Sequence, residues 1–477
     1  MNESLRTLWY MGAKSRLVPD FIDGAVGDLV APGGTVLDLC AGTGVVARSL
    51  ATRYRVYAND AQRFSSVLAA AHLVGDAGWV AELDRLDPEE DLDAAFRENL
   101  DALTRWLPRA LELEAALLPR VIEELGRPRK ERATDAESET TTAASRYRAF
   151  VETLPLSVSE AGLVRATPHA TDFEPLVSEY ATLLDARRCD PSTRPYGLMT
   201  LYYQGVYFGL RQALVIDSLR AAIDAIPATD PFRERKHDLY LGALLQACST
   251  STSGTSHFAQ PRALTRDSEL LAVARRRSID IETEFYRALD GIRREWGEHP
   301  RFSPMNRVFG STAGELLSAD GPLADGEVDL VYLDPPYTAD NYSRFYHVLE
   351  TIVSYDYPEL EERAGQITKG RYPVRARRFQ SDFCRADRVE GAFREVVSLC
   401  AERKIKLLVS YSPDSGLLLK SWRQRSVGDP MPPESRFLAL FRDYYSDVEM
   451  RTRDLLHSGQ GDSNRSVREV LVLCEDV

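Results

Sequence analysis

Cysteine is scarce in this sequence, and its spacing disfavours two classes of protein. The 477 residues include six cysteines, which lie far apart and form no C-x-x-C pair. The seven histidines do not cluster with them. We therefore expect reduced, mostly buried thiols, and neither a zinc site nor a disulfide framework.

Long apolar runs are also missing. The N-terminal segment has no uninterrupted apolar core of signal-peptide length, and no later run approaches the length that spans a bilayer. Apolar residues make up 44% of the chain and charged residues 27%, which is ordinary for a soluble globular protein. The sequence predicts a cytoplasmic protein without a membrane partner.

Positive charge is in short supply. Lysine and arginine number 59 against 72 acidic residues, which gives a formal net charge of −13. Any surface that binds a polyanion must therefore be a local basic patch. One segment, 367–380, has no acid and contains Lys369, Arg371, Arg375, Arg377 and Arg378. Such a run is usually a solvated face, but its place shortly after the sharpest motif of the chain favours contact with phosphate.

The first recognisable unit is a strand, a glycine loop, a helix and a second strand. Residues 35–40 are apolar and rich in β-formers, AGTG follows at 41–44, and 45–54 has helical spacing. Residues 55–60 form a second short strand that ends in the carboxylate of Asp60. This order predicts the opening of a parallel α/β sheet, in which ligands bind at the carboxyl ends of the strands.

A long, mainly helical stretch follows, from about 62 to 300. Strands return late, at 327–337, 404–412 and 466–476. We interpret the two α/β portions as halves of one sheet, interrupted by a helical insertion. The predicted division is 1–75 and 301–477 for the α/β portions and 76–300 for the insertion.

The sharpest chemical signal is Asp334-Pro335-Pro336-Tyr337, directly after an apolar strand. The lone pair of an exocyclic amine is delocalised into its base, so two acceptors for the amine hydrogens would make the nitrogen more nucleophilic. The carboxylate of Asp334 and the main-chain carbonyl of Pro335 suit those two roles, and the prolines stiffen the turn. Tyr337 offers a ring face on which a base removed from a double helix can stack. The alternative is a proline turn that simply ends a strand, but the position at a strand end favours function.

The glycine loop after the first strand is the second candidate site. Asp38 precedes Ala41-Gly42-Thr43-Gly44, and glycine there lets the backbone approach a ligand closely. The spacing is not G-x-G-x-x-G and no phosphate-binding lysine follows, which excludes a P-loop. A strand-end carboxylate beside a short glycine loop suits a cationic amino-acid ligand such as S-adenosylmethionine (SAM). Asp60 is placed to accept hydrogen bonds from ribose hydroxyls.

Two further segments carry weaker signals. In the N-terminal segment Lys14 could pair with a carboxylate and Tyr10 could pack on a flat ring, although in isolation both are ordinary residues of a first helix. His257 lies in a Ser/Thr-rich loop and could contact a substrate, although a loop residue of this kind is more often merely packed.

Taken in order, these motifs resemble the Dam-type (alpha-arrangement) family of DNA adenine N6-methyltransferases. That family opens with an aromatic-x-Gly-x-Lys segment, here YMGAK at 10–14, followed by the SAM loop, here DLCAGTG at 38–44. A ribose-binding acid, here Asp60, and a late D-P-P-Y complete the order. Further segments are similar to modification methylases of type IIS restriction systems: 207–223, 240–260, 334–358, 370–375, 406–418 and the closing strand. The resemblance covers most of 5–75 and 195–477.

The resemblance implies a Rossmann-like SAM-dependent methyltransferase sheet with a large, mainly helical insertion. It implies that SAM is the cofactor and is bound by one group of residues, and that the tetrapeptide at 334–337 acts on a flipped adenine. The group that would bind SAM comprises Tyr10, Lys14, Asp38, Ala41, Gly42, Gly44, Asp60 and Ser311. Ser311 stands where the family often has an acid that binds the cofactor's adenine. No metal is implied, because SAM is already an activated electrophile.

The implied function is site-specific methylation of adenine N6 in double-stranded DNA, for restriction-modification, phage defence or epigenetic marking at the nucleoid. Residues 76–300 would read the target, with His257 and the basic segment as DNA contacts. A restriction or defence-system protein is a further possible partner. Two alternatives stay open: an RNA adenine N6-methyltransferase, and a SAM- and DNA-binding subunit of a defence complex without turnover of its own.

Overall fold

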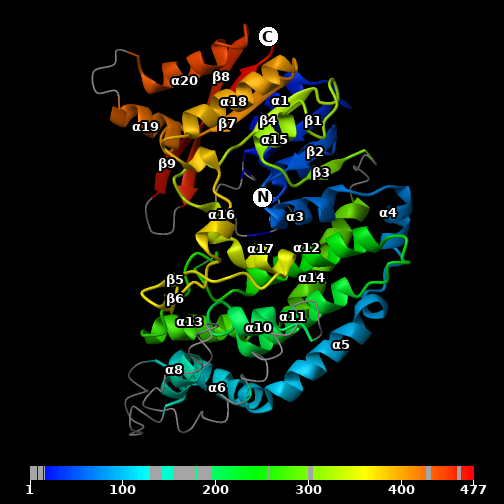
Figure 1. Cartoon of the computed structure of the whole chain (residues 1–477), viewed down its shortest axis with the longest axis vertical. Coiled ribbons are helices and arrows are strands. Elements are labelled where there is room, and N and C mark those ends of the chain that lie inside the picture. Colours follow the sequence, from blue (N-terminus) through cyan, green and yellow to red (C-terminus); the bar gives the residue numbers. More distant parts are fainter. Residues whose placement is uncertain are drawn as a thin grey trace. The chain divides into compact units, whose positions relative to one another are not determined.

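Two compact units make up the protein in the computed structural model. It describes residues 8, 14, 17–128, 142–153, 179, 195–255, 257–298, 305–425, 431–458 and 464–477. The first unit, here called the sheet unit, comprises 1–84, 293–343 and 379–477; the second, the helical unit, comprises 85–292 and 344–378. The labels in Figure 1 follow the chain through both units.

The sheet unit is built on one seven-stranded sheet in the order β3-β2-β1-β4-β7-β9-β8. The first five of these strands run parallel, and β9 is antiparallel to both of its neighbours. The strands are β1 (Thr35–Asp38), β2 (Arg55–Asn59), β3 (Arg307–Phe309), β4 (Leu330–Leu333), β7 (Lys406–Tyr411), β8 (Val448–Ser458) and β9 (Asn464–Cys474). The prediction that the early and late α/β portions share one sheet is confirmed.

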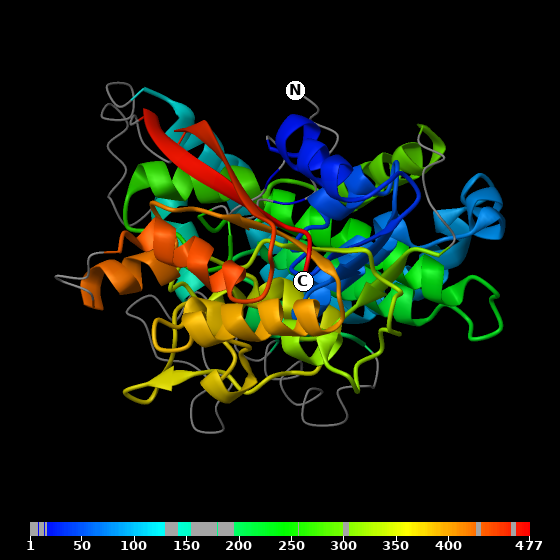
Figure 2. The ribbon, with the colours of Figure 1, turned by 90° about the horizontal axis from the view of Figure 1, so that it is seen from above.

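Side-chain alternation along these strands creates a separate core on each face of the sheet. In β1, Leu37 contributes to one core and Val36 to the other, and both are fully buried. The core with Leu37 is covered by α15 (Ala313–Leu317), α18 (Val389–Glu402), α19 (Leu417–Arg425) and α20 (Pro433–Arg442). The core with Val36 is covered by α1 (Asp23–Leu29), α2 (Val45–Leu50) and α3 (Arg63–Leu73). Figure 2 shows α1 and α18 on opposite sides of the sheet.

Strand order reverses at β1, because the chain moves from β1 outward through β2 to β3 and then returns to β4 on the other side of β1. Crevices at such switch points, outside the carboxyl ends of the strands, are where ligands bind in open α/β sheets. Both β1 and β4 lead directly into predicted site residues, since β1 ends at Asp38 and β4 at Leu333.

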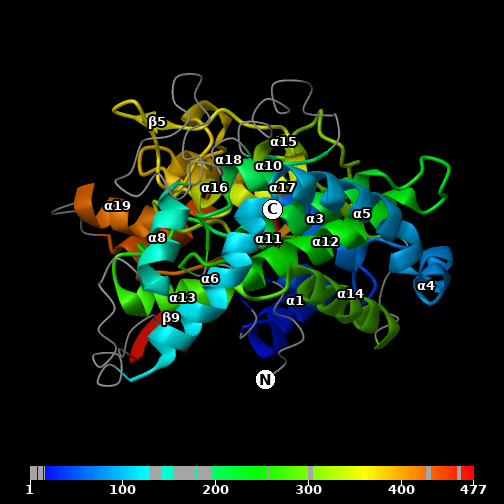
Figure 3. The ribbon, with the colours of Figure 1, turned by 90° about the horizontal axis from the view of Figure 1, so that it is seen from below.

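Helices dominate the second unit, as the sequence predicts for this region. They are α5 (Pro88–Trp106), α6 (Pro108–Gly126), α8 (Ala143–Thr153), α10 (Leu198–Tyr202), α11 (Leu210–Asp224), α12 (Arg233–Ser251), α13 (Asp267–Arg277), the start of α14 (Ile281–Glu298) and α17 (His347–Ser354). α11 packs along α5, and α6 contacts α8 and α13 (Figure 3). A short hairpin of β5 (Glu362–Arg363) and β6 (Gln366–Ile367) lies in the segment 344–378, which the sequence division placed with the α/β part.

Within the described ranges, no single helix is both long and apolar enough to cross a membrane. α3 and α4 (Ala77–Leu83) meet that criterion only as a pair, with a bend of 88° between them. The same ranges contain no group of three or more His, Cys, Asp or Glu residues that could hold a metal ion.

Candidate active site

A cavity of about 410 Å³ opens at the carboxyl ends of the parallel strands, entirely within the sheet unit. Motifs far apart in the sequence line it together. The predicted residues among its lining are Lys14, Asp38, Ala41, Gly42, Asp60, Ser311, Asp334, Pro335, Pro336 and Tyr337. Gly44 lies one step behind this lining, as the residue that precedes α2. Tyr10 lies outside the described residues.

The glycine loop has the backbone conformation that its residues predict. Gly42 and Gly44 have positive φ angles of 54° and 72°, which side chains with a Cβ rarely adopt. The N–H of Gly42 donates to Oδ2 of Asp60 at 2.9 Å, so the carboxylate after β2 also shapes the loop after β1. The second oxygen of Asp60 accepts from the N–H of Gln62 at 2.9 Å. A ribose hydroxyl would share these oxygens with the backbone.

Asp38 is a buried carboxylate with spare hydrogen-bonding capacity. The residue is 1% exposed, and its Oδ2 accepts from the N–H of Ala47 at 3.1 Å. Oδ1 has no hydrogen-bond partner among the described residues. Burial, and then the nearby charge of Asp334, raise the pKa of Asp38 well above its usual range. A buried unsatisfied acceptor is costly unless a ligand supplies a donor, and an ammonium group would both satisfy it and hold it ionised.

Asn59, at the end of β2, was not singled out in the sequence. It is 1% exposed and donates from Nδ2 to the carbonyls of Leu39 and Ser311, both at 3.0 Å. Its Oδ1 accepts from the N–H of Ser311 at 3.1 Å. The side chain of Asn59 therefore holds the turn at Ser311 beside the cavity by bonding to the backbone of Ser311. Only the pairing of β1, β2 and β3 brings these segments together.

The cavity also contains a polar side chain that has no predicted role. Gln62 is 7% exposed, lines the cavity, and its Oε1 is buried without a hydrogen-bond partner among the described residues. Oδ1 of Asp38 is another such acceptor on the cavity wall. Together with the glycine loop and the cavity volume, these acceptors fit a ligand such as SAM, which carries an ammonium, ribose hydroxyls and an exocyclic amine.

The tetrapeptide after β4 lies at the same cavity. Asp334 is largely buried, with 17% of its side chain exposed, and its Oδ1 forms an ion pair with Nζ of Lys14 at 3.0 Å. Burial raises the pKa of Asp334 to about 6, against the lowering effect of Lys14 and with a further raising effect from Glu469. Nζ of Lys14 also lies 5.2 Å from the centroid of the Tyr337 ring, and the carbonyl of Tyr337 accepts from the N–H of Leu417 at 2.8 Å. Lys14 therefore holds the motif at Asp334, and the N–H of Leu417 holds it at Tyr337.

Glu469 completes this cluster and was also missed in the sequence. It lies on β9, is 4% exposed, and its Oε1 is 3.0 Å from Nζ of Lys14. A weak signal existed, since Glu469 directly precedes the apolar run at 470–474 of the predicted last strand. Its pairing with Lys14 depends on the fold and has no signal in the sequence.

Cys40 lines the cavity but is not activated. Burial and the neighbouring carboxylates raise the pKa of its thiol well above the usual range, so it stays protonated. The thiol of Cys40, two residues beyond β1, is therefore a packed side chain and not a nucleophile.

The cations of the basic segment differ in exposure and in their partners within the helical unit. Arg371 is 3% exposed and donates to the carbonyls of Leu201 and Tyr202, so its guanidinium is committed to the protein. Arg378 pairs with Glu361 at 3.0 Å, with 9% of its side chain exposed. Lys369, Arg375 and Arg377 are exposed, and Arg377 pairs with Asp356 at 3.1 Å.

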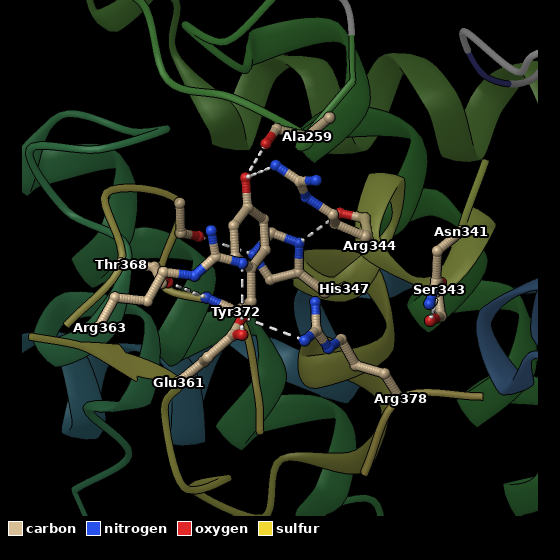
Figure 4. Close-up of polar contacts among 11 residues, drawn as sticks. Ala259, Asn341, Ser343, Arg344, His347, Glu361, Arg363, Thr368, Tyr372 and Arg378 are labelled. Atoms are coloured by element: carbon tan, nitrogen blue, oxygen red, sulfur yellow. Dashed lines mark hydrogen bonds and ion pairs between the residues drawn. The ribbon is translucent and has the colours of Figure 1, made fainter. Parts of the chain in front are cut away.

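Figure 4 shows how this segment is fastened around Tyr372. The Tyr372 hydroxyl donates to the carbonyl of Ala259 and accepts from Arg344 at 3.3 Å, and the Arg344 guanidinium lies 4.7 Å from the ring centroid. The two ring nitrogens of His347 lie 2.9 Å from the carbonyl oxygens of Arg344 and Gly370. His257 is half-buried and packs edge-on against Phe345, with ring centroids 4.7 Å apart. The loop that carries His257 and the basic segment are therefore parts of one packed cluster of the helical unit.

The sheet order and the cavity define a Rossmann-like α/β domain of the methyltransferase type. Residues 318–378 match the family described as D12 class N6 adenine-specific DNA methyltransferase. The chain is 40% identical over 222 residues to the type II methyltransferase M.FokI of Planomicrobium okeanokoites, a match covering 45% of this chain and 28% of the relative. It is 25% identical over 226 residues to the modification methylase LlaI of Lactococcus lactis subsp. lactis, covering 46% of this chain and 30% of that relative. No solved structure matches.

The resemblance predicted from the sequence, to adenine N6-methyltransferases and modification methylases, is confirmed by these matches. The matches span less than a third of either relative's length.

Proposed function

We propose that this protein is a site-specific DNA methyltransferase that transfers a methyl group from SAM to the N6 amine of adenine, within a restriction-modification or related defence system. The observation that carries the proposal is the placement of Asp334-Pro335-Pro336-Tyr337 at the end of β4, in the same cavity as Asp38, the glycine loop and Asp60. If the proline turn only ended a strand, its place in one cavity with Asp38 and Asp60 would be a coincidence.

Cofactor binding follows from the acceptors on the cavity wall. Oδ1 of Asp38 would accept from the ammonium of SAM, Asp60 from its ribose hydroxyls, and Oε1 of Gln62 from a further donor such as the adenine amine. When bound, SAM supplies a methyl group already activated on a sulfonium. The carboxylates around the cavity favour a ligand with that positive charge.

Catalysis by the chain's own residues would be polarisation and positioning. The Asp334 carboxylate and the Pro335 carbonyl accept the two hydrogens of the adenine amine, which directs its lone pair at the methyl carbon. Tyr337 stacks on the base. As the new nitrogen–carbon bond forms and the sulfur–carbon bond breaks, the amine gives up one proton. Asp334 is placed to accept it.

Double-stranded DNA with the target adenine flipped out is the proposed substrate, met in the cytoplasm at the nucleoid. The exposed members of the basic segment, Lys369, Arg375 and Arg377, are the proposed phosphate contacts, and His257 a proposed contact in the target-reading helical unit. Arg371 and Arg378 would support that surface from below, since both are tied to the protein.

The direct test is transfer from labelled SAM to unmethylated genomic DNA, followed by nucleoside analysis. Label in N6-methyladenine is the expected result. In a competition assay, label in structured RNA instead of DNA would identify RNA as the substrate. SAM binding without transfer to either would favour a subunit that needs a partner protein.

A further inference from the structure

The ammonium of Lys14 lies between two carboxylates, the largely buried Asp334 and the buried Glu469, at 3.0 Å from an oxygen of each. The side chains of Lys14 and Glu469 are each 5% exposed. The three residues come from the N-terminal segment, the end of β4 and β9. A buried lysine charge needs one counter-charge, and Lys14 has two.

Glu469 is itself fixed in place. The hydroxyl of Ser410, on β7, donates at 2.8 Å to Oε1 of Glu469, the same oxygen that meets Lys14. β7 and β9 pair directly, with Tyr411 opposite Val470. Two adjacent strands of the sheet therefore hold the carboxylate that faces Lys14.

The charges of this cluster act on Asp334 in opposite directions. Burial raises the pKa of Asp334 most, Lys14 lowers it, and Glu469 raises it again. The other ionisable groups coupled to Asp334 are Asp38, Cys40, Tyr332 and Tyr337. For Lys14, burial alone would lower the pKa, but Asp334 and Glu469 outweigh it and keep the ammonium charged.

We propose that Glu469 is a positioning residue that, through Lys14, fixes the orientation and the charge of Asp334. Held by Glu469, Lys14 forms its ion pair with Oδ1 of Asp334 and leaves Oδ2 for the substrate amine. The family resemblance implies that Lys14 binds SAM. In this proposal its main role is instead to hold the carboxylate that acts on the base. The positioning role rests on the function proposed above, whereas the charge coupling does not.

The charge coupling is testable without activity, by following the carboxyl ¹³C signal of Asp334 against pH in aspartate-labelled full-length protein, assigned with Asp334→Asn. Glu469→Gln removes a negative charge but leaves Lys14 paired one-to-one with Asp334, so the midpoint of Asp334 should fall by about one pH unit. Lys14→Met should move the midpoint upward by about one unit or more. Glu475→Gln is the matched control, because Glu475 directly follows β9 and pairs with Lys406. It should leave the midpoint unchanged.

Turnover then tests the positioning role. Glu469→Gln should lower kcat about tenfold, the order that one misplaced hydrogen-bonding group costs, and should shift the acidic limb of the pH–rate profile downward. Its SAM affinity should match the wild type. Should Glu469→Gln not fold, Ser410→Ala loosens Glu469 without removing its charge, and a lower kcat at unchanged SAM affinity is expected.

Opposite shifts of the Asp334 midpoint in Glu469→Gln and Lys14→Met support the proposal. If Asp334 titrates at the same pH in both variants, the proposal is overturned. A variant with full kcat and an unmoved acidic limb also overturns it. If the wild type transfers no methyl group, the function proposed above fails, while the carbon titration still decides whether Glu469 and Lys14 control Asp334.

Discussion

At the scale of single residues, the candidate site is a set of buried and half-buried carboxylates with unequal surroundings. Asp38 keeps one oxygen unsatisfied, Asp60 gives both oxygens to backbone N–H groups, and Asp334 pairs with Lys14. Under the proposed function, the same side-chain chemistry serves three different roles: holding a cation, shaping a loop and acting on a substrate. Which carboxylate does which follows from burial and partners.

Asp334→Ala should abolish methyl transfer, with a loss of at least about 10²–10³-fold in kcat, because one of the two acceptors that polarise the amine disappears. SAM affinity should change little, since the acceptors proposed for SAM lie elsewhere in the cavity. Labelled-methyl transfer and equilibrium SAM binding measure the two quantities. Asp340→Ala, in an exposed position six residues along, is the control. Near-normal activity of Asp334→Ala would refute the proposed chemistry.

Asp38→Asn should weaken SAM binding about tenfold or more, because a neutral amide replaces the buried carboxylate proposed for the ammonium. Binding of a SAM analogue that lacks the ammonium should be far less affected. Calorimetric titration of both ligands checks this. An equal loss for the two would place the ammonium elsewhere.

Activity should fall as the pH drops below about 6, where the Asp334 carboxylate becomes protonated. The sign follows from the role: the ionised form accepts an amine hydrogen, and the protonated form does so poorly. A profile of kcat/KM between pH 5 and pH 8, with folding monitored in parallel, measures the limb. A flat profile across this range would contradict an acceptor role for Asp334.

At the scale of elements, two turns at the carboxyl ends of β1 and β4 carry the site, and each is stiffened differently. The first relies on Gly42 and Gly44 at positive φ, the second on two consecutive prolines. A loop that must approach a ligand closely needs glycine, whereas a loop that presents carbonyls benefits from residues without N–H groups.

Gly44→Ala should destabilise the protein by about 1–2 kcal/mol, because alanine is strained at a φ of 72°. An added Cβ would be 3.6 Å from its nearest neighbours, both on Ala69, which is ordinary contact. The backbone is therefore the source of the cost. Chemical denaturation compares it with Gly391→Ala, a position in α18 where a Cβ meets nothing within 4 Å and alanine should stabilise. An unchanged midpoint for Gly44→Ala would argue against the left-handed turn.

Element prediction succeeded where the local pattern agreed with the packing. β1, β2, β4, β7 and β9 were predicted because each carries an apolar run for the sheet core. β8 was not predicted. It is an edge strand with Glu449, Arg451 and Arg453 among its residues, and it forms through its pairing with β9.

At the scale of the whole molecule, the net charge of −13 restricts how the protein can meet DNA. Only a few exposed cations are proposed as phosphate contacts, so binding should depend on salt more weakly than for a basic DNA-binding protein.

Replacing Lys369, Arg375 and Arg377 together by glutamine should weaken DNA binding and reduce the slope of log K against log salt, by up to about 0.9 for each phosphate that the protein no longer neutralises. SAM binding should be unaffected, since these residues belong to the helical unit. Fluorescence anisotropy across a salt series provides the slope. Arg275→Gln, an exposed arginine of α13, is the control. An unchanged slope in the triple variant would place the DNA elsewhere.

By itself, the sequence determined the class of sheet, the helical character of the middle region and the motifs at the ends of β1, β2 and β4. These features depend on periodicity, glycine and proline, which act over a few neighbouring residues.

The tertiary structure alone decided which of these residues meet. Lys14 pairs with Asp334 and Glu469, which lie in the last third of the chain, Asn59 fixes the Ser311 turn, and Arg371 is withdrawn into the protein. Such pairings depend on strand order and on burial, which set the distance and the cost of each charge, and neither can be derived from the spacing of residues along the chain.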